Sequence, residues 1–111
     1  MTAEIGNNQT VYYWVEPVKI GNERRELFTA VCSSGLVMSS LGNKEELLDE
    51  LQAKLRRYLP GFVLAESKEP NREAIKQFKE YFSGLRRQFS IPLLQLGTPF
   101  QLEVWRQLQK I

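Results

Sequence analysis

Short runs of β-branched and aromatic residues dominate the first part of the chain, and apolar residues recur at helical spacing further along. The strand-like runs cover residues 10–20, 26–33 and 36–41. Turn-forming pairs separate them, Gly21-Asn22 after the first run and Ser34-Gly35 after the second. This pattern predicts three strands joined by tight turns, and because the turns are short we expect an antiparallel meander.

Pro17 lies inside the first predicted strand. Proline has no backbone N–H to donate to a neighbouring strand, so it is found at sheet edges and at bulges. We therefore expect an edge or a bulge in this part of residues 10–20.

Two helices are predicted next, one after Asn43 and one from Pro70-Asn71. Asn43 suits the N-cap, Glu46 stands at the capping-box position, and Pro60-Gly61 ends the first helix. The two apolar faces consist of Leu47, Leu48, Leu51, Leu55, Tyr58 and Leu59, and of Ala74, Ile75, Phe78, Tyr81, Phe82 and Leu85. Residues 62–65 fit a short fourth strand that the helical crossover allows to lie parallel to a neighbour. The order predicts an α+β fold: a three-stranded antiparallel sheet, a possible short fourth strand and two helices.

The last part of the chain contains a linker and a further helix. Residues 86–96 include Pro92 and an apolar patch, which predicts a packed connection between two domains. Thr98 can cap the helix, Pro99 suits its first position, and the Gln101 amide can reach back to the cap. Its apolar stripe is Phe100, Val104, Leu108 and Ile111, and a stripe of this kind requires a partner surface.

The composition favours a soluble globular protein. Of 111 residues, 42% are hydrophobic and 25% are charged, and no apolar run approaches the roughly 20 residues that span a bilayer. The N-terminus lacks the regions of a secretory signal, so we expect a cytoplasmic protein with no membrane contact. A lone cysteine, Cys32, excludes an intramolecular disulfide. With 15 basic and 13 acidic residues there is no dominant cationic field, and we interpret the basic clusters mainly as solvated faces.

The chain contains no histidine. This excludes a Ser-His-Asp or Cys-His nucleophile pair, an imidazole general base and a histidine-containing metal site within these residues. Only a carboxylate, lysine, tyrosine or cysteine mechanism is left.

A family resemblance rests on the run Gly97-Thr98-Pro99-Phe100-Gln101, followed by Val104-Trp105, Leu108 and Ile111. The run resembles the beginning of the catalytic domain of methylated-DNA–protein-cysteine methyltransferases, the O6-alkylguanine-DNA alkyltransferases. The resemblance implies that residues 1–90 are the family's ribonuclease-H-like N-terminal domain. Residues 91–111 would then be a linker and the first helix of the catalytic, DNA-binding domain.

The resemblance also implies a function in DNA repair. In the family, a flipped guanine gives its O6-alkyl group to a histidine-activated cysteine in a Pro-Cys-His-Arg segment, beyond a helix-turn-helix. Neither segment occurs in these 111 residues, so we expect the chain to be an inactive fragment without catalytic residues, metal or cofactor. Its expected partners are double-stranded DNA, through the full-length protein, and the catalytic domain as an intramolecular partner. We expect a monomer.

The same resemblance implies DNA contacts at Gln101 and Thr98. In the family the start of this helix lies close to the DNA backbone, and free N–H groups at a helix N-terminus suit an anion. The capping box uses two of those donors, so capping and phosphate contact are alternative roles for these residues.

Two other kinds of chemistry, a nucleophilic cysteine and a two-metal site, are considered, and for both we favour a purely structural role of the residues. Cys32 lies in an apolar strand, so we expect a core residue and not an alkyl acceptor. A two-metal nuclease site would need several converging carboxylates, and Asp49, Glu16 and Glu26 are too few and too dispersed.

The aromatic residues Tyr12, Tyr13, Trp14 and Phe28 suggest either a base-stacking platform or core packing. We favour the core because no lysine or arginine is interleaved with them between Val11 and Val18. Two other functions stay open: an interaction module that uses the apolar stripe of the last helix, and an alkyltransferase-like protein that binds lesions without repairing them.

Overall fold

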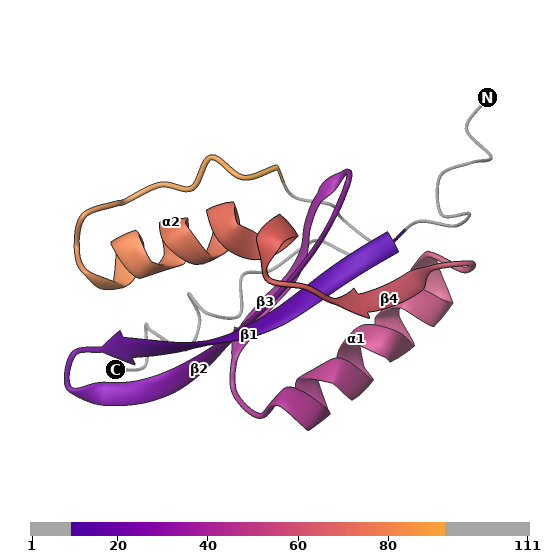
Figure 1. Cartoon of the computed structure of the whole chain (residues 1–111), viewed down its shortest axis with the longest axis horizontal. Helices are drawn as coiled ribbons and strands as arrows, with labels where there is room; N and C mark the ends of the chain where they lie inside the picture. The colour runs from indigo at the N-terminus through magenta and orange to yellow at the C-terminus, as the bar shows by residue number, and fades with distance from the viewer. Residues whose placement is uncertain (1–9, 93–111) are drawn as a thin grey trace.

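A four-stranded sheet forms the middle layer of the molecule, with one helix on each side (Figure 1). The computed structural model describes residues 10–92. In chain order, the elements are β1 (Thr10–Ile20), β2 (Glu23–Cys32), β3 (Gly35–Leu41), α1 (Lys44–Tyr58), β4 (Val63–Glu66), the 3₁₀ turn η1 (Glu69–Asn71) and α2 (Arg72–Phe82). The predicted α+β class is confirmed.

The strands lie in the order β3-β2-β1-β4. β1, β2 and β3 form the expected antiparallel meander, with a register shift in β2 between Ala30 and Val31. β4 pairs with β1 in parallel, as the crossover predicted, but only along Thr10 to Tyr13. The second half of β1 is therefore an open edge beyond β4. Pro17 lies in this half, where its missing N–H costs no ladder hydrogen bond.

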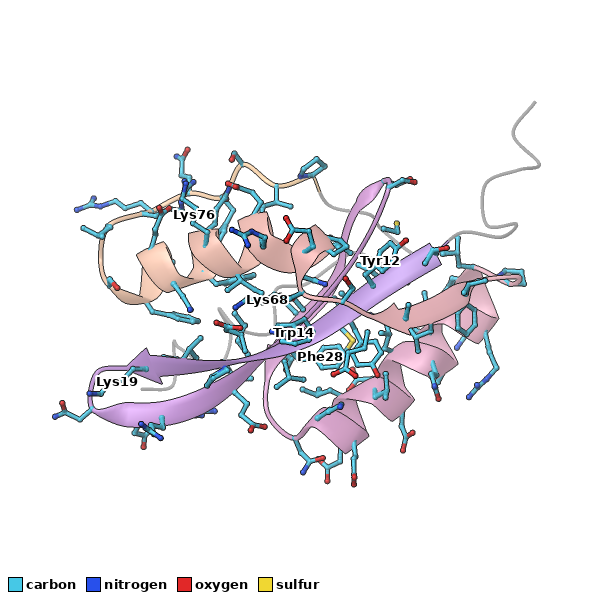
Figure 2. All side chains as sticks on the ribbon, in the orientation of Figure 1. Tyr12, Trp14, Lys19, Phe28, Lys68 and Lys76 are labelled. Carbon is cyan, nitrogen blue, oxygen red and sulfur yellow. The ribbon has the colours of Figure 1, made fainter. Side chains whose placement is uncertain are left out.

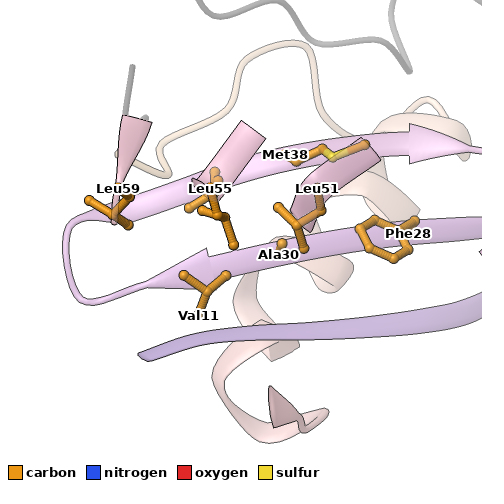
Figure 3. Close-up of a cluster of buried hydrophobic side chains, with 8 residues drawn as sticks. Val11, Phe28, Ala30, Met38, Leu51, Leu55 and Leu59 are labelled. Atoms are coloured by element: carbon orange, nitrogen blue, oxygen red, sulfur yellow. The ribbon is translucent and has the colours of Figure 1, made fainter. Parts of the chain in front are cut away.

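Alternate residues of β2 face opposite helices, because strand side chains point in turn to the two sides of a sheet. Phe28 and Ala30 pack against α1, and Leu27 and Val31 pack against α2. The cluster under α1 consists of Val11, Phe28, Ala30, Val37, Met38, Leu51, Leu55 and Leu59 (Figure 3). Burying one such leucine stabilises the fold by about 1.5–3 kcal/mol, so both helices are held mainly by apolar packing.

The helix ends follow the sequence signals with one exception. The Asn43 side chain accepts hydrogen bonds from the backbone N–H groups of Glu45, at 2.8 Å, and Glu46, at 3.1 Å, which confirms the predicted cap. The prediction for Leu85 was wrong: this residue does not extend the apolar face of α2 and is 80% exposed. The helix ends at Phe82, and the chain then turns at Gly84, whose φ of 79° favours glycine.

Asn71 is completely buried and ties the start of α2 to the sheet. Its carbonyl oxygen accepts a 2.8 Å hydrogen bond from the Thr29 hydroxyl. Its amide nitrogen donates to the carbonyl oxygens of Tyr12, at 3.1 Å, and Ser67, at 2.9 Å. Asn71 therefore positions the second helix through tertiary contacts and makes no side-chain cap at its N-terminus.

Candidate functional site: a basic groove beside the open strand edge

Glu16 is a buried carboxylate on the open half of β1, 7% exposed. One carboxylate oxygen accepts a 2.9 Å hydrogen bond from the Trp14 indole and lies 3.5 Å from the Lys68 ammonium. The other accepts a 2.8 Å hydrogen bond from Lys79 of α2. Burial by itself raises the pKa of Glu16, but the hydrogen bonds from Lys79 and Trp14 and the two lysine charges outweigh it and lower the pKa below 4.5. Glu16 is therefore ionised at neutral pH.

This ion network belongs to the wall of a groove between α2 and the open edge of β1. A first hollow of about 610 Å³ is lined by Glu16, Lys68 and residues of α2. A second hollow of about 520 Å³ reaches Pro17 and the β1–β2 turn. Lys79 and Ser83 line both, so the two hollows adjoin each other. We call them together the basic groove, because they are lined by the six cations Lys19, Arg24, Lys68, Arg72, Lys76 and Lys79.

The cations of the basic groove come from segments that are distant in sequence. Lys19 lies near the end of β1 and Lys76 lies on α2 (Figure 2), whereas Arg24 lies at the start of β2. Three carboxylates, Glu16, Glu73 and Glu80, also line the groove. With twice as many cations as carboxylates, the groove favours an anionic ligand.

Residues 86–92 form a second feature, an extended segment that packs along α2. The side-chain amide of Gln77 donates a hydrogen bond to the Ser90 hydroxyl, and the Ser90 backbone N–H donates to the Gln77 carbonyl oxygen, both at 2.9 Å. The ring of Phe89 lies 4.7 Å from that of Phe78 and 5.6 Å from that of Tyr81, measured between centroids. The segment is therefore fixed to the helix by polar and aromatic contacts.

The end of this segment reaches the sheet at the β2–β3 turn. The backbone N–H of Leu36 donates a 2.8 Å hydrogen bond to the carbonyl oxygen of Pro92. Gly35 makes this approach possible, since a Cβ atom at this position would lie 2.4 Å from the same oxygen. The packing expected for this linker is confirmed as far as Pro92.

The DNA-contact candidates from the sequence, Gln101 and Thr98, lie outside the described residues, as does the apolar stripe of the last helix. Cys32 is the last residue of β2 and is half-buried against the α1 cluster. It also lines a cavity of about 570 Å³, whose described lining includes Tyr12, Glu73 and Pro92 but no lysine or arginine. The cations that would activate a nucleophilic thiol are thus missing from the described surroundings of Cys32.

The carboxylates considered for a two-metal site do not converge. Asp49 is exposed on α1, Glu26 is exposed on β2, and Glu16 is bound to lysines. Within residues 10–92, no three histidine, cysteine, aspartate or glutamate side chains come together as metal ligands.

The aromatic residues divide between the two faces of the sheet. Tyr13 stacks on Phe28 at a centroid distance of 5.9 Å, in the α1 layer. Tyr12 packs against the α2 cluster, and the Trp14 indole donates to Glu16. The four rings therefore form no single stacking platform, and the prediction of structural packing is confirmed for Tyr12, Tyr13 and Phe28.

The sequence pattern indicated neither the ion network of Glu16 nor the basic groove. A glutamate between Val15 and Pro17 in an apolar strand was a usable signal, since a carboxylate there needs a partner if it is buried. Its partner Lys79, however, lies 63 residues away in sequence.

The described residues thus form an α+β domain with a basic groove, and comparisons with known proteins identify its relatives. The chain is 30% identical over 105 residues to the inducible methylated-DNA–protein-cysteine methyltransferase of Bacillus subtilis, covering 95% of this chain and 55% of that protein. It is 56% identical over 39 residues to the constitutive enzyme of the same organism, covering 35% of this chain and 24% of that protein. A methyltransferase of Methanosarcina barkeri is 40% identical over 72 residues, covering 63% of this chain and 45% of that protein.

The chain belongs to the methylated-DNA–protein-cysteine methyltransferase family. It spans at most about half the length of these curated relatives. No family model matches the chain. No solved structure matches it either, so the ribonuclease-H-like relationship of the fold stays a prediction. Neither α1 nor α2 is long and apolar enough to cross a membrane.

Proposed function

We propose that this chain is the N-terminal part of a DNA-repair alkyltransferase that transfers a methyl or other alkyl group from guanine O6 to its own cysteine. Residues 1–90 form the N-terminal domain, and residues 91–111 are the linker and the first helix of the catalytic domain. The similarity to the inducible enzyme supports this proposal, because it extends over 95% of the chain but only 55% of that protein.

The observation that carries the proposal is the attachment of residues 86–92 to the domain. Gln77 holds Ser90, Phe78 packs on Phe89, and the β2–β3 turn holds Pro92. The segment is thereby fixed as far as Pro92, shortly before the run from Gly97 that resembles the start of the catalytic domain. A fixed exit point restricts how the next domain is oriented, which helps to place a catalytic group against its substrate. The domain therefore acts as a scaffold for the catalytic part.

Alkyl transfer needs a thiolate that attacks the alkyl carbon: a sulfur–carbon bond forms and the bond from that carbon to guanine O6 breaks. The thiol available in this chain is Cys32, and no histidine is present to activate it. No lysine or arginine is among the described residues that line the cavity beside it. The proposed role of the chain is therefore structural, and the chain alone is inactive.

Intact-protein mass spectrometry tests this role. The chain and its Cys32→Ser variant are incubated with a duplex that contains O6-methylguanine, with the full-length constitutive methyltransferase of Bacillus subtilis as positive control. We expect neither form of the chain to gain the mass of a methyl group. A stoichiometric gain in the parent chain that Cys32→Ser abolishes would show that Cys32 is an acceptor and that the proposal is wrong.

The start of the last predicted helix is the proposed site of a phosphate contact, at Gln101 and, secondarily, at Thr98. Gln101→Ala should weaken DNA binding by the full-length protein about two- to tenfold, the loss expected for one hydrogen bond that contributes about 0.5–1.5 kcal/mol. Gln107→Ala is the matched control, because it makes the same truncation later in the segment. Equal effects of the two substitutions would contradict a specific role for Gln101.

A further inference from the structure

Three cations of the basic groove have no ionic partner among residues 10–92. Lys19, Arg24 and Lys76 are exposed and form no ion pair there. Lys68 and Lys79, by contrast, share the buried carboxylate of Glu16. The groove therefore contains unneutralised positive charge in addition to the lysines that bind Glu16.

The carboxylates of the groove are already held by other donors. Glu16 is buried beneath its two lysines, and Glu80 accepts a 2.8 Å hydrogen bond from Arg86. Glu73 accepts a 2.7 Å hydrogen bond from Gln77. Glu16 and Glu80 are thus less able to repel an anion than exposed, unpaired carboxylates would be, whereas Glu73 is exposed and keeps its full negative charge.

The opposite helix does not show this excess of positive charge. α1 carries four cations, Lys44, Lys54, Arg56 and Arg57, and four carboxylates, Glu45, Glu46, Asp49 and Glu50. The whole chain has a net charge of only +2, so the surplus in the groove reflects a local concentration of charge. An extended anion should therefore approach the molecule on the α2 side.

We propose that the basic groove binds the phosphodiester backbone of double-stranded DNA. The cations line two adjoining hollows, one at the β1–β2 turn and one along α2, and this spread of charge suits a ligand with regularly repeated phosphates. Flexible lysine and arginine side chains bind phosphates without reading the bases, so the binding is independent of sequence.

The groove fits a duplex better than a single strand. Binding of single strands relies on exposed rings on which bases stack. The aromatic residue among the groove's described lining is Phe82, which packs against the α2 cluster and the Phe78 ring. The inference goes beyond the proposed function, because it assigns a DNA contact to the scaffold itself and does not depend on alkyl transfer.

Two triple variants of the whole chain test the proposal. The groove variant combines Lys19→Gln, Arg24→Gln and Lys76→Gln, and the control variant combines Lys54→Gln, Arg56→Gln and Arg57→Gln on α1. Both variants lose three positive charges, so a difference in their DNA affinity depends on where the charges lie and not on the net charge. The binding of each to a short duplex without alkylated bases is measured by fluorescence anisotropy over a range of salt concentrations.

We expect the groove variant to bind at least about tenfold more weakly than the parent chain at about 0.1 M salt, with a shallower salt dependence, and the control variant to change much less. Equal weakening of both variants, or no binding by the parent chain, would overturn the proposal. Tighter binding of single-stranded DNA or RNA, or equally effective competition by polyglutamate, would overturn the assignment to duplex DNA.

An NMR titration of the parent chain provides a second test that does not depend on how well the variants fold. Duplex DNA should shift the backbone amide signals of Lys19, Arg24 and Lys76 more than those of α1. Larger shifts on α1 would contradict the proposal. Failure of either test leaves the scaffold function intact, since that function is judged by methyl transfer and by the attachment of residues 86–92.

Discussion

Gln77 and Ser90 are joined by two hydrogen bonds of 2.9 Å, each residue donating one and accepting one. Gln77 is only 1% exposed, whereas Ser90, on the segment that follows α2, is exposed. A buried side-chain amide is stable only when its polar atoms are paired. The pair therefore specifies where residues 86–92 lie on the helix.

Replacing Gln77 should release this segment. In Gln77→Ala the Ser90 backbone N–H loses its acceptor, and we expect unfolding free energy to fall by about 1–3 kcal/mol. Ser90→Ala removes only the hydroxyl and should cost about 1 kcal/mol. Urea unfolding measures both values, and hydrogen exchange should show lost protection of the Ser90 amide in Gln77→Ala alone. Unchanged protection of that amide would contradict this role of Gln77.

A substitution at Gly35 should disturb the other end of the segment. Gly35→Ala places a Cβ atom 2.4 Å from the Pro92 carbonyl oxygen, at a backbone φ of 132° that L-residues rarely adopt. We expect a loss of at least about 2 kcal/mol in unfolding free energy. Gly21→Ala is the matched control: it also has a positive φ, of 62°, but its Cβ would meet no atom within 4 Å. Equal losses in the two variants would argue against the contact with Pro92.

The ion network of Glu16 should contribute to stability in a pH-dependent way. Because the folded protein has a lowered Glu16 pKa, the contribution is complete above pH 4.5 and is lost as pH falls through the folded pKa. Glu16→Gln should lower unfolding free energy at pH 7 by about 1–2 kcal/mol, a modest value because Lys79 is half-exposed.

Unfolding curves of the parent chain and of Glu16→Gln, recorded from pH 7 downward, measure this contribution. The difference between them should shrink below pH 4.5, since the other carboxylates affect both proteins alike. Glu23→Gln serves as control, because Glu23 forms only an exposed 3.7 Å ion pair with Arg25. A difference that stays constant down to pH 3 would show that ionisation of Glu16 is not involved.

Replacing the side-chain amide nitrogen of Asn71 by oxygen, as in Asn71→Asp, should strongly destabilise the fold. In Asn71→Asp a carboxylate oxygen would face the carbonyl oxygens of Tyr12 and Ser67, with which the amide now forms hydrogen bonds. We expect a loss of about 3 kcal/mol or more, or failure to fold, by thermal denaturation. Thr29→Val removes only one hydroxyl donor to Asn71 and should cost about 1 kcal/mol. A smaller loss for Asn71→Asp than for Thr29→Val would contradict this account.

Strand bounds and helix caps that depend on residues adjacent in sequence were predicted well. The bounds of β1 agree with the predicted residues 10–20, and the cap at Asn43 lies where the sequence placed it. β2 begins at Glu23, three residues before the predicted start at Glu26, because the ladder with β1 continues up to the pair of Ile20 and Glu23 beside the turn. Apolar patterning cannot detect this extension, since the added residues are charged.

The sequence alone determined the family, the α+β class and the positions of most strands and helices, because turn signals, caps and apolar periodicity are local properties of the chain. Only the tertiary structure decided that Glu16 meets Lys79, that Asn71 ties α2 to the sheet and that Pro92 reaches Leu36. It also brought Lys19 and Arg24 into one groove with the cations of α2. These pairs are far apart in sequence, so their proximity depends on how the layers pack and which strand edge stays open, and local spacing does not encode it.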